Sequence, residues 1–196
     1  ITEYLISGPD SGVNFSCDVE CRVLTGNLWK EQLSQAKEAI VFIDEGNSFI
    51  KTKEFAAAVK ETGFYYVIVT RESIETLPIS VDEIYGIRSS GKYGSLTPVY
   101  HEFYKIYDFG QLKGYPLKPK ELLVEDSNSG FEFFNTIAVE NNLRCYAANG
   151  KSNIYKWLCA NTVKQDTVII ADGAAFGSQM NRIERLVRRN PLIHLY

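Results

Sequence analysis

"ELLVEDSNSGFEFFNTIAVENNLRCYAANGKSNIYKWLCANTVKQDTVIIADG", residues 121–173, decides the fold of this chain. Short apolar segments alternate in it with longer segments whose apolar residues recur at helical spacing. Together with the residues that follow, the stretch predicts strands at 121–126, 144–150, 166–173 and 192–196. It predicts helices at 130–142, 151–162 and 179–190. This β-α-β-α-β-α-β order indicates an α/β unit built on a parallel sheet.

The first half of the chain shows the same alternation over a shorter length. "AIVFI" (39–43) is apolar at every position, as in a strand covered on both faces. An amphipathic helix is predicted over 51–63, with a glycine at its end, and a second buried strand over 64–73. A short polar helix at about 28–37 and a strand around 21–24 precede them. Strand, helix and strand in this order predict a second set of parallel strands.

The segment between the two regions is rich in glycine, proline and tyrosine. The alternation in "VYHEFYKIYDF" (99–109) suits an edge strand or a hairpin, and a tyrosine stacking surface is the alternative interpretation. We therefore predict three parts: a first unit over 1–90, an aromatic connector over 91–120 and a second unit over 121–196.

Composition and charge exclude several classes of protein. With 196 residues, 45% of them hydrophobic, the chain has the composition of an ordinary globular protein. Its net charge of −3 argues against a globally basic nucleic-acid binder. No stretch approaches the ~20 apolar residues of a membrane span, and no signal-peptide pattern is present. We therefore expect no membrane partner and a cytoplasmic location. Because Met180 is the only methionine and the chain stops in strand-like "PLIHLY", we expect a fragment of a longer protein.

Two adjacent acids, Asp44 and Glu45, follow the strand at 39–43. Four apolar residues followed by Asp-Glu resemble the Walker B element of P-loop NTPases. The resemblance implies that Asp44 holds Mg²⁺ through water and that Glu45 polarises the attacking water. It also implies a sensor of the γ-phosphate at Thr70 and Arg71, which follow the next strand.

A Walker B element needs a Walker A loop, and none is present in the sequence. Gly150, Lys151 and Ser152 do not fit, because Cys145 stands where the loop requires its first glycine. ATP is therefore expected as a ligand only if a phosphate-binding loop lies upstream of Ile1, and the chain as given is not expected to hydrolyse it. In the alternative interpretation the acid pair merely begins a solvated loop.

Residues 121–196 resemble the topoisomerase-primase (Toprim) domain, particularly that of the overcoming-lysogenization-defect nucleases, which join a P-loop ATPase to a Toprim domain. That family has a Glu after the first strand, a Gly-Lys turn after the second and D-x-D-x-x-G after the third. At these positions the chain offers Glu125, Gly150 with Lys151, and Asp172 with Gly177.

The resemblance implies a magnesium site with Glu125, Asp126 and Asp172 as ligands and with Glu125 and Asp172 as catalytic residues. Carboxylates at the strand ends would bind Mg²⁺, which neutralises phosphate charge and activates a nucleophile. Ala174 stands where the family has its second Asp, so one ligand is missing. Asp126 could replace it only by reaching across the site. We therefore expect weak metal binding and doubtful catalysis.

The same residues also resemble the receiver domain of two-component signalling. "LLVED" is how such domains begin, and Asp172 would accept the phosphoryl group. A Toprim-like unit should bring Glu125, Asp172 and Lys151 together, whereas a receiver should bring Asp126 close to Asp172. The remaining alternative is a Rossmann-like interaction module without catalysis.

Four arginines lie on the last predicted helix: Arg182, Arg185, Arg188 and Arg189. Positive charge near a helix C-terminus usually marks a solvated face. The functional alternative is a phosphate-binding set of Lys151, Arg185 and Arg189 that contacts nucleic acid. We therefore predict an α/β chain of parallel Rossmann-like sheets: a partial P-loop-like unit followed by a Toprim-like unit. As function we predict a nucleotide-responsive protein that acts on or near nucleic acid. No pattern specifies a substrate or an oligomeric state.

Overall fold

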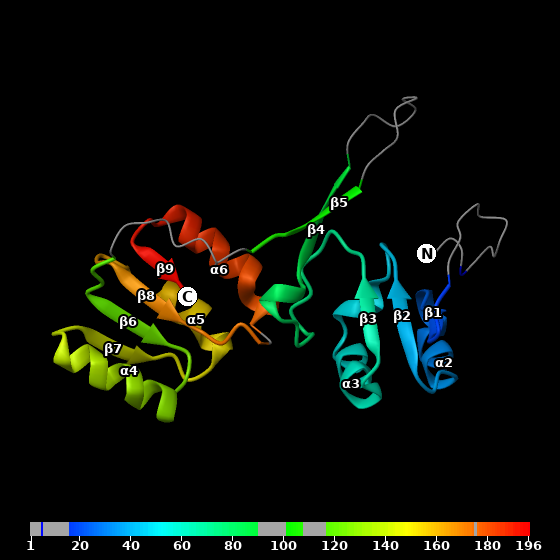
Figure 1. The fold of residues 1–196 in the computed structure, drawn as a ribbon, viewed down its shortest axis with the longest axis horizontal. Helices are drawn as coiled ribbons and strands as arrows, with labels where there is room; N and C mark the ends of the chain where they lie inside the picture. Colours follow the sequence, from blue (N-terminus) through cyan, green and yellow to red (C-terminus); the bar gives the residue numbers. More distant parts are fainter. Residues whose placement is uncertain (1–4, 6–15, 90–100, 108–116, 175) are drawn as a thin grey trace. The chain divides into compact units, whose positions relative to one another are not determined.

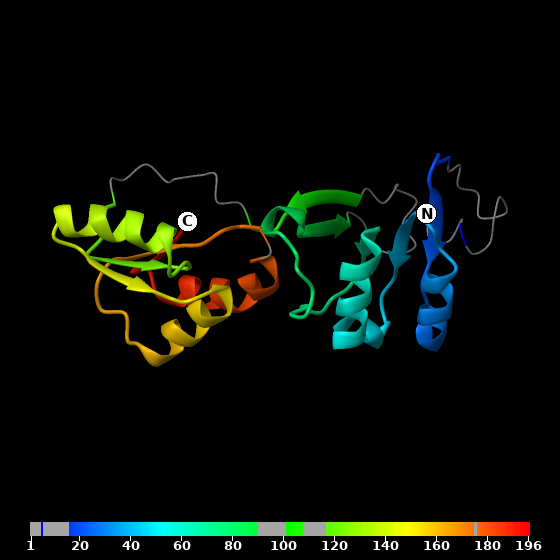
Figure 2. The same ribbon diagram turned by 90° about the horizontal axis from the view of Figure 1, so that it is seen from below.

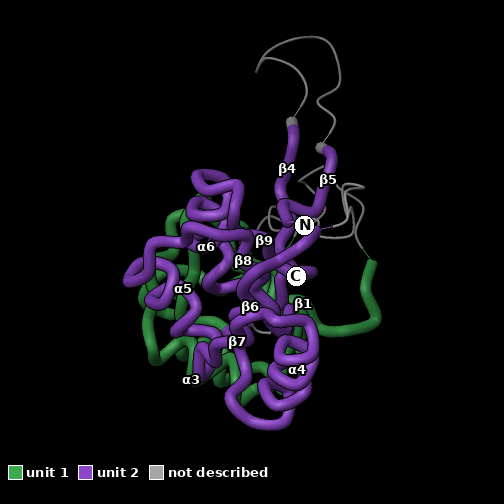
Figure 3. Tube along the Cα trace, turned by 90° about the vertical axis from the view of Figure 1, so that its left-hand side faces the viewer, with its two compact units in different colours: residues 1–77 green, residues 78–196 purple. Residues whose placement is uncertain are grey.

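The computed structural model describes residues 5, 16–89, 101–107, 117–174 and 176–196 (Figure 1). The chain divides into two compact units, residues 1–77 and 78–196, which Figure 3 distinguishes by colour. Residues 78–89, which the sequence pattern places in the first unit, group with the second. Most of the predicted connector, at 91–100 and 108–116, lies outside the described residues.

Unit 1, residues 1–77, contains a parallel sheet of three strands in the order β1-β2-β3. Its elements are β1 (Glu20–Val23), η2 (Gly26–Leu28), α2 (Trp29–Ser34), β2 (Ala39–Ile43), η3 (Ser48–Lys51), α3 (Lys53–Thr62) and β3 (Tyr65–Ile68). Both crossovers advance along the sheet in the same direction, so right-handed connections place both helices on one face (Figure 2). The parallel pairing of β2 with β3, predicted from the two apolar runs, is confirmed.

An aromatic cluster forms the core of unit 1. The ring of Phe55, with 0% exposure, lies 5.5 Å from the ring of Trp29, 5.2 Å from that of Phe49 and 5.9 Å from that of Tyr66. The Thr52 hydroxyl accepts the N–H of Phe55 at 3.1 Å and so caps α3. The cap fixes the first turn of α3, which carries Phe55. The Phe55 ring therefore joins α3 to α2, η3 and the sheet.

Unit 2, residues 78–196, contains a parallel sheet of four strands in the order β7-β6-β8-β9. The strands of this sheet are β6 (Glu121–Val124), β7 (Arg144–Ala147), β8 (Thr167–Ile170) and β9 (Ile193–Leu195). The helices between them are α4 (Ser129–Glu140), α5 (Lys151–Ala160) and α6 (Gly177–Arg189). The predicted α/β class with parallel, Rossmann-like sheets is confirmed.

Consecutive residues of the central strands of unit 2 supply two separate cores. Leu122 packs with Ala138 of α4 on one face of the sheet. Leu123 packs on the other face with residues of α5 and α6, including Ile154 and Ile183. Figure 2 shows α4 on one side of this sheet and α5 and α6 on the other. The continuous apolar runs of β6 and β8 follow from this burial on both faces.

A two-stranded antiparallel hairpin precedes this sheet in the sequence. It consists of β4 (Tyr85–Ser89) and β5 (His101–Lys105), and the short helix η4 (Val81–Glu83) leads into it. The alternation that predicted an edge strand or hairpin is confirmed for β5. The Tyr104 ring covers Gly86, and the Arg88 guanidinium lies 4.4 Å from the centre of that ring.

The segment before the hairpin docks onto the start of α6. The N–H of Gly177 donates to the carbonyl of Ile79 at 2.8 Å, and the N–H of Val81 donates to the carbonyl of Gly173 at 3.1 Å. A Cβ built on Gly177 would lie 2.7 Å from the Ile79 oxygen and 2.9 Å from the carbonyl carbon of Ser80. The close approach of the two backbones therefore requires glycine at this position.

No helix in the described part of the chain is long and apolar enough to cross a membrane. The longest helix there, α6, has 13 residues. Such a helix is about 20 Å long, whereas the hydrocarbon core of a bilayer is about 30 Å thick.

Candidate functional site

The strand order of unit 2 creates a topological switch point between β6 and β8. From β6 the chain moves outward through α4 to β7, and then returns through α5 across β6 to β8. Because the two crossover helices lie on opposite faces, a crevice is expected at the carboxyl ends of β6 and β8. Ligands of open parallel sheets bind at such points. Glu125 directly follows β6, and Asp172 lies two residues beyond β8.

Glu125 and Asp172 are in direct contact at this edge. The backbone N–H of Asp172 donates to Oε2 of Glu125 at 2.9 Å. The N–H of Glu125 donates to the carbonyl of Ile170 at 2.9 Å, which continues the pairing of the two strands. The carboxylate of Asp172 accepts the N–H of Ala174 at 2.9 Å through Oδ1. The structure thus brings together the two acids on which the predicted metal site depends.

The loop from β7 to α5 meets the same edge. The N–H of Gly150 donates to the carbonyl of Glu125 at 2.8 Å. Lys151, the first residue of α5, comes directly after Gly150 in the sequence. Gly150 has φ of 106° and Asn149 has φ of 59°, and the side-chain amide of Asn153 donates to the Asn149 carbonyl at 2.8 Å. Two left-handed residues in succession turn the chain sharply at the strand end. The turn places the N-terminus of α5, which favours anions, beside Glu125.

Asp126, the third predicted ligand, is engaged at the start of α4. Its carboxylate accepts backbone N–H groups from Ser127 at 2.7 Å, Asn128 at 3.1 Å and Gly130 at 2.9 Å. These hydrogen bonds hold the pKa of the Asp126 carboxyl below its usual range, because they stabilise the charged form. The interactions that the structure gives this carboxylate are thus with its own loop, and its role as a metal ligand stays a prediction.

We expect Asp126→Ala to destabilise the protein in a pH-dependent way. Since the folded pKa is lowered, the stabilisation is fully present above the unfolded pKa of about 3.9 and is lost as the pH falls through the folded pKa. Urea unfolding from neutral to acidic pH should show the variant below the wild type at pH 7 and a shrinking difference in acid. Glu140→Ala, at the other end of α4, is the control and should show no corresponding trend.

Among the described residues, no three His, Cys, Asp or Glu side chains gather closely enough to hold a metal ion. Of the three predicted ligands, Glu125 and Asp172 are in contact, and their contact runs through a backbone N–H. Any bound cation would therefore complete its shell with water or with oxygen atoms of a ligand. Ala174, which stands where the Toprim pattern predicts a second Asp, is exposed.

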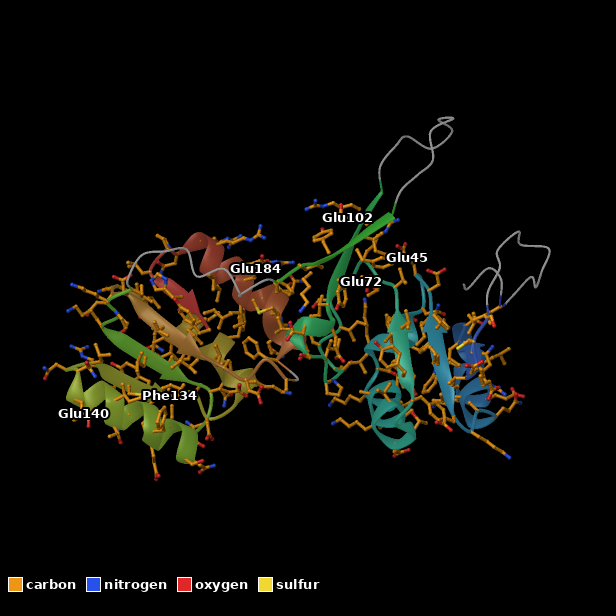
Figure 4. All side chains as sticks on the ribbon, in the orientation of Figure 1. Glu45, Glu72, Glu102, Phe134, Glu140 and Glu184 are labelled. Atoms are coloured by element: carbon orange, nitrogen blue, oxygen red, sulfur yellow. The ribbon has the colours of Figure 1, made fainter. Side chains whose placement is uncertain are left out.

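The two acids predicted to serve a nucleotide, Asp44 and Glu45, also follow a strand and lie at the carboxyl edge of the sheet of unit 1. Nε of Arg71 is 3.1 Å from each carboxylate oxygen of Glu45, and this ion pair joins the ends of β2 and β3. Thr70 accepts the N–H of Glu72 at 3.0 Å, and Figure 4 shows Glu45 and Glu72 at the same end of this sheet. The carboxylate of Asp44 accepts the N–H of Glu45 at 2.8 Å. The residues predicted to serve a nucleotide are thus neighbours, although the sequence does not predict the pairing of Glu45 with Arg71.

The arginines of α6 are exposed. Arg182, Arg185 and Arg189 are spaced by three and four residues and so share one face of the helix. Arg182 lies 5.5 Å from the centre of the Tyr155 ring. Arg188 instead forms an ion pair with Glu184 at 2.5 Å. The i,i+4 spacing of Glu184 and Arg188 is the signal in the sequence that separates Arg188 from the other three.

Sequence reasoning missed a cavity in unit 2, because its walls come from distant segments. Its volume is about 360 Å³. It is lined by Val81, Asp82, Lys105, Tyr107, Ala171, Gly173, Phe176, Met180, Leu195 and Tyr196. Two of these residues, Ala171 and Gly173, flank Asp172 in the sequence, so the cavity adjoins the candidate site.

No family model, no curated protein and no solved structure matches this chain. The α/β architecture with parallel sheets is shown by the structure itself. The P-loop and Toprim resemblances stay predictions that rest on the residues quoted above.

Proposed function

We propose that unit 2 is a Toprim-like module that binds Mg²⁺ weakly at Glu125 and Asp172 and acts on phosphodiester groups of nucleic acid. The supporting observation is the 2.9 Å contact between Asp172 and Glu125 at the switch point of the sheet. Carboxylate oxygens are the ligands that Mg²⁺ prefers, and a bound ion neutralises phosphate charge and activates a nucleophile. Ala174 removes one ligand, so we propose that catalysis is weak or lost.

The contacts of Asp126 favour this proposal over a receiver-like module. A receiver would use Asp126 and Asp172 together to hold a cation next to the phosphoryl acceptor. The Asp126 carboxylate instead accepts three N–H groups of the loop that leads into α4, whereas Glu125 contacts Asp172. The pair in contact is therefore the one on which the Toprim interpretation depends.

Titration with Mn²⁺ as a substitute for Mg²⁺ tests the metal site. We expect the full chain to bind one ion with about millimolar affinity, in the range of weak cation sites built from few carboxylates. Glu125→Gln and Asp172→Asn should each abolish the binding measured by calorimetry. Glu140→Gln, an exposed acid at the other end of α4, should leave it unchanged. Equal weak binding to all four proteins would assign the ion to general surface charge and would contradict the proposal.

For unit 1 we propose a nucleotide-responsive role, with ATP as a ligand only if a Walker A loop lies upstream of Ile1. Asp44 would hold the magnesium ion through water and Glu45 would orient the attacking water. The ion pair between Glu45 and Arg71 supports this assignment, because it links the proposed catalytic acid to the residue proposed to sense the γ-phosphate. Loss of that pair on nucleotide binding would couple the nucleotide to the end of β3.

The basic face of α6 is proposed to contact nucleic-acid phosphates. Arg185→Glu combined with Arg189→Glu should weaken the binding of single-stranded and double-stranded DNA for all sequences alike, because phosphate contacts carry no sequence information. The slope of log affinity against log salt should fall by about 1 for each phosphate that the variant no longer neutralises. Fluorescence anisotropy at several salt concentrations measures both quantities.

A double variant with the same change in charge provides the control. Lys156→Glu with Lys164→Glu reverses two exposed lysines outside α6. We expect this variant to bind DNA more tightly than the arginine variant does. Equal weakening by the two variants would show a response to net charge alone, and α6 would then be a solvated face.

A further inference from the structure

The cavity beside Asp172 combines two kinds of wall. Phe176, Met180 and Val81 are 2%, 1% and 6% exposed and form apolar parts of it. Lys105 and Asp82 supply charge, and Nζ of Lys105 lies 2.7 Å from Oδ1 of Asp82. An apolar pocket with a few polar groups is the usual composition of a small-molecule site.

Besides Lys105, Tyr107 is a hydrogen-bond donor in the cavity wall. Burial, with a smaller contribution from the charge of Glu184, raises the pKa of its phenol, and the arginines Arg185 and Arg188 oppose this shift. The phenol is therefore protonated at neutral pH and can donate a hydrogen bond. The cavity wall thus includes Tyr107 as a donor and the ion pair of Lys105 with Asp82, whose side chains are 47% and 77% exposed, beside an aromatic and thioether surface.

We propose that this cavity binds the base of an adenine nucleoside or nucleotide. A volume of about 360 Å³ is at the small end of the range for ligand pockets, which suits a fused heterocycle with its sugar. The flat faces of adenine match the apolar surface of Phe176 and Met180. Its ring nitrogens accept hydrogen bonds and its amino group donates them, which matches the donors and the acceptor of the cavity.

The position of the cavity determines how a bound nucleotide would be oriented. Ala171 and Gly173 line the cavity, and Asp172 between them contacts Glu125. A base held in the cavity would therefore extend its sugar and phosphates toward the carboxyl ends of β6 and β8, where ligands of such sheets bind. The phosphate part of this inference rests on the proposed metal site, whereas the binding of the base does not require it.

The chain carries its own probe of the cavity. Met180 is the only methionine of the sequence, and it lines the cavity. Carbon-13 labelling of the methionine methyl group in the full chain gives one NMR signal from Met180. If an initiator methionine is added for expression, it gives a second signal, and the signal that disappears in Met180→Leu is the one from Met180. Adenosine should shift this signal in a saturable way, because the ring current of a bound base acts on a methyl group in contact with it.

Three variants locate the binding. Gly173→Leu adds a side chain to the cavity wall at a position where a Cβ meets no atom within 4 Å, so it should weaken adenosine binding tenfold or more, or about 1.4 kcal/mol, without unfolding the unit. Tyr107→Phe removes one hydrogen bond and should weaken binding several-fold. Ala160→Leu, an exposed addition at the end of α5, should change nothing.

A fourth variant separates the two proposals. Asp172→Asn should leave adenosine binding intact and remove only the Mg²⁺-dependent gain in affinity for AMP, so that failure of the metal site does not imply failure of the cavity. No shift of the Met180 signal with adenosine up to about 5 mM, in the weakest range of specific affinity, would overturn the inference. It would also be overturned if benzoate shifted the signal and adenosine did not, or if Gly173→Leu bound adenosine as the wild type does.

Discussion

Replacing Phe55 by alanine is expected to destabilise unit 1 by about 3–5 kcal/mol, the range for large aromatic side chains in protein cores. The ring is fully buried and contacts the rings of Trp29, Phe49 and Tyr66. Its removal leaves a cavity where α2, η3, α3 and the sheet meet, because three rigid rings cannot collapse into the space.

Amide hydrogen exchange measures this loss within unit 1 itself. Protection in β2, at Val41 and its neighbours, should fall by several orders of magnitude in Phe55→Ala. Tyr65→Ala is the matched aromatic control, because its side chain is 67% exposed and lies on the same sheet. If the two variants lost similar protection in β2, the aromatic cluster would not be the main source of stability in unit 1.

Gly177→Ala is expected to give the second large effect, a destabilisation of about 1–3 kcal/mol in unit 2. The added Cβ would lie 2.7 Å from the carbonyl oxygen of Ile79 and 2.9 Å from the carbonyl carbon of Ser80, and neither backbone atom can rotate away as a side chain does. The segment must shift, which also weakens the hydrogen bond from the N–H of Gly177 to Ile79.

Gly173→Ala is the control for this substitution. A Cβ at Gly173 meets no atom within 4 Å, and the residue does not require a left-handed backbone, so the change should be nearly neutral. Thermal unfolding of the two variants compares them directly. Because Val81 lines the cavity and belongs to the displaced segment, Gly177→Ala should also weaken adenosine binding. Equal melting temperatures for the two variants would contradict the close packing of this segment against α6.

The strands of both parallel sheets and the helices between them can be predicted from the sequence, because apolar runs and helical spacing are patterns of neighbouring residues. The apolar run "AIVFI" coincides with β2, in which four of five residues are buried, and "LLV" coincides with the three buried residues of β6. The contact of Glu125 with Asp172 also follows, because parallel strands deliver the residues after them to one edge.

Other features depend on contacts between distant segments and so left little local signal. The pairing of Tyr85–Ser89 with β5 needs a register that one alternating run does not define. The cavity needs the docking of residues 79–84 on the start of α6, and that docking also groups residues 78–89 with unit 2 rather than unit 1. The hydrogen bonds of Asp126 are different, because an Asp followed by Ser-Asn-Ser before a helix is a recognisable turn signal that the metal interpretation obscured.

The most direct test of the proposed metal site is a calorimetric titration of Ala174→Asp with Mg²⁺. The N–H of residue 174 already donates to the Asp172 carboxylate, so a carboxylate added at this exposed position begins next to the existing pair. We predict that the variant binds one Mg²⁺ at least tenfold more tightly than the wild type, because a third hard oxygen ligand replaces water. Combining it with Asp172→Asn should remove the gain. Unchanged, negligible binding in Ala174→Asp would mean that Glu125 and Asp172 do not form a metal site.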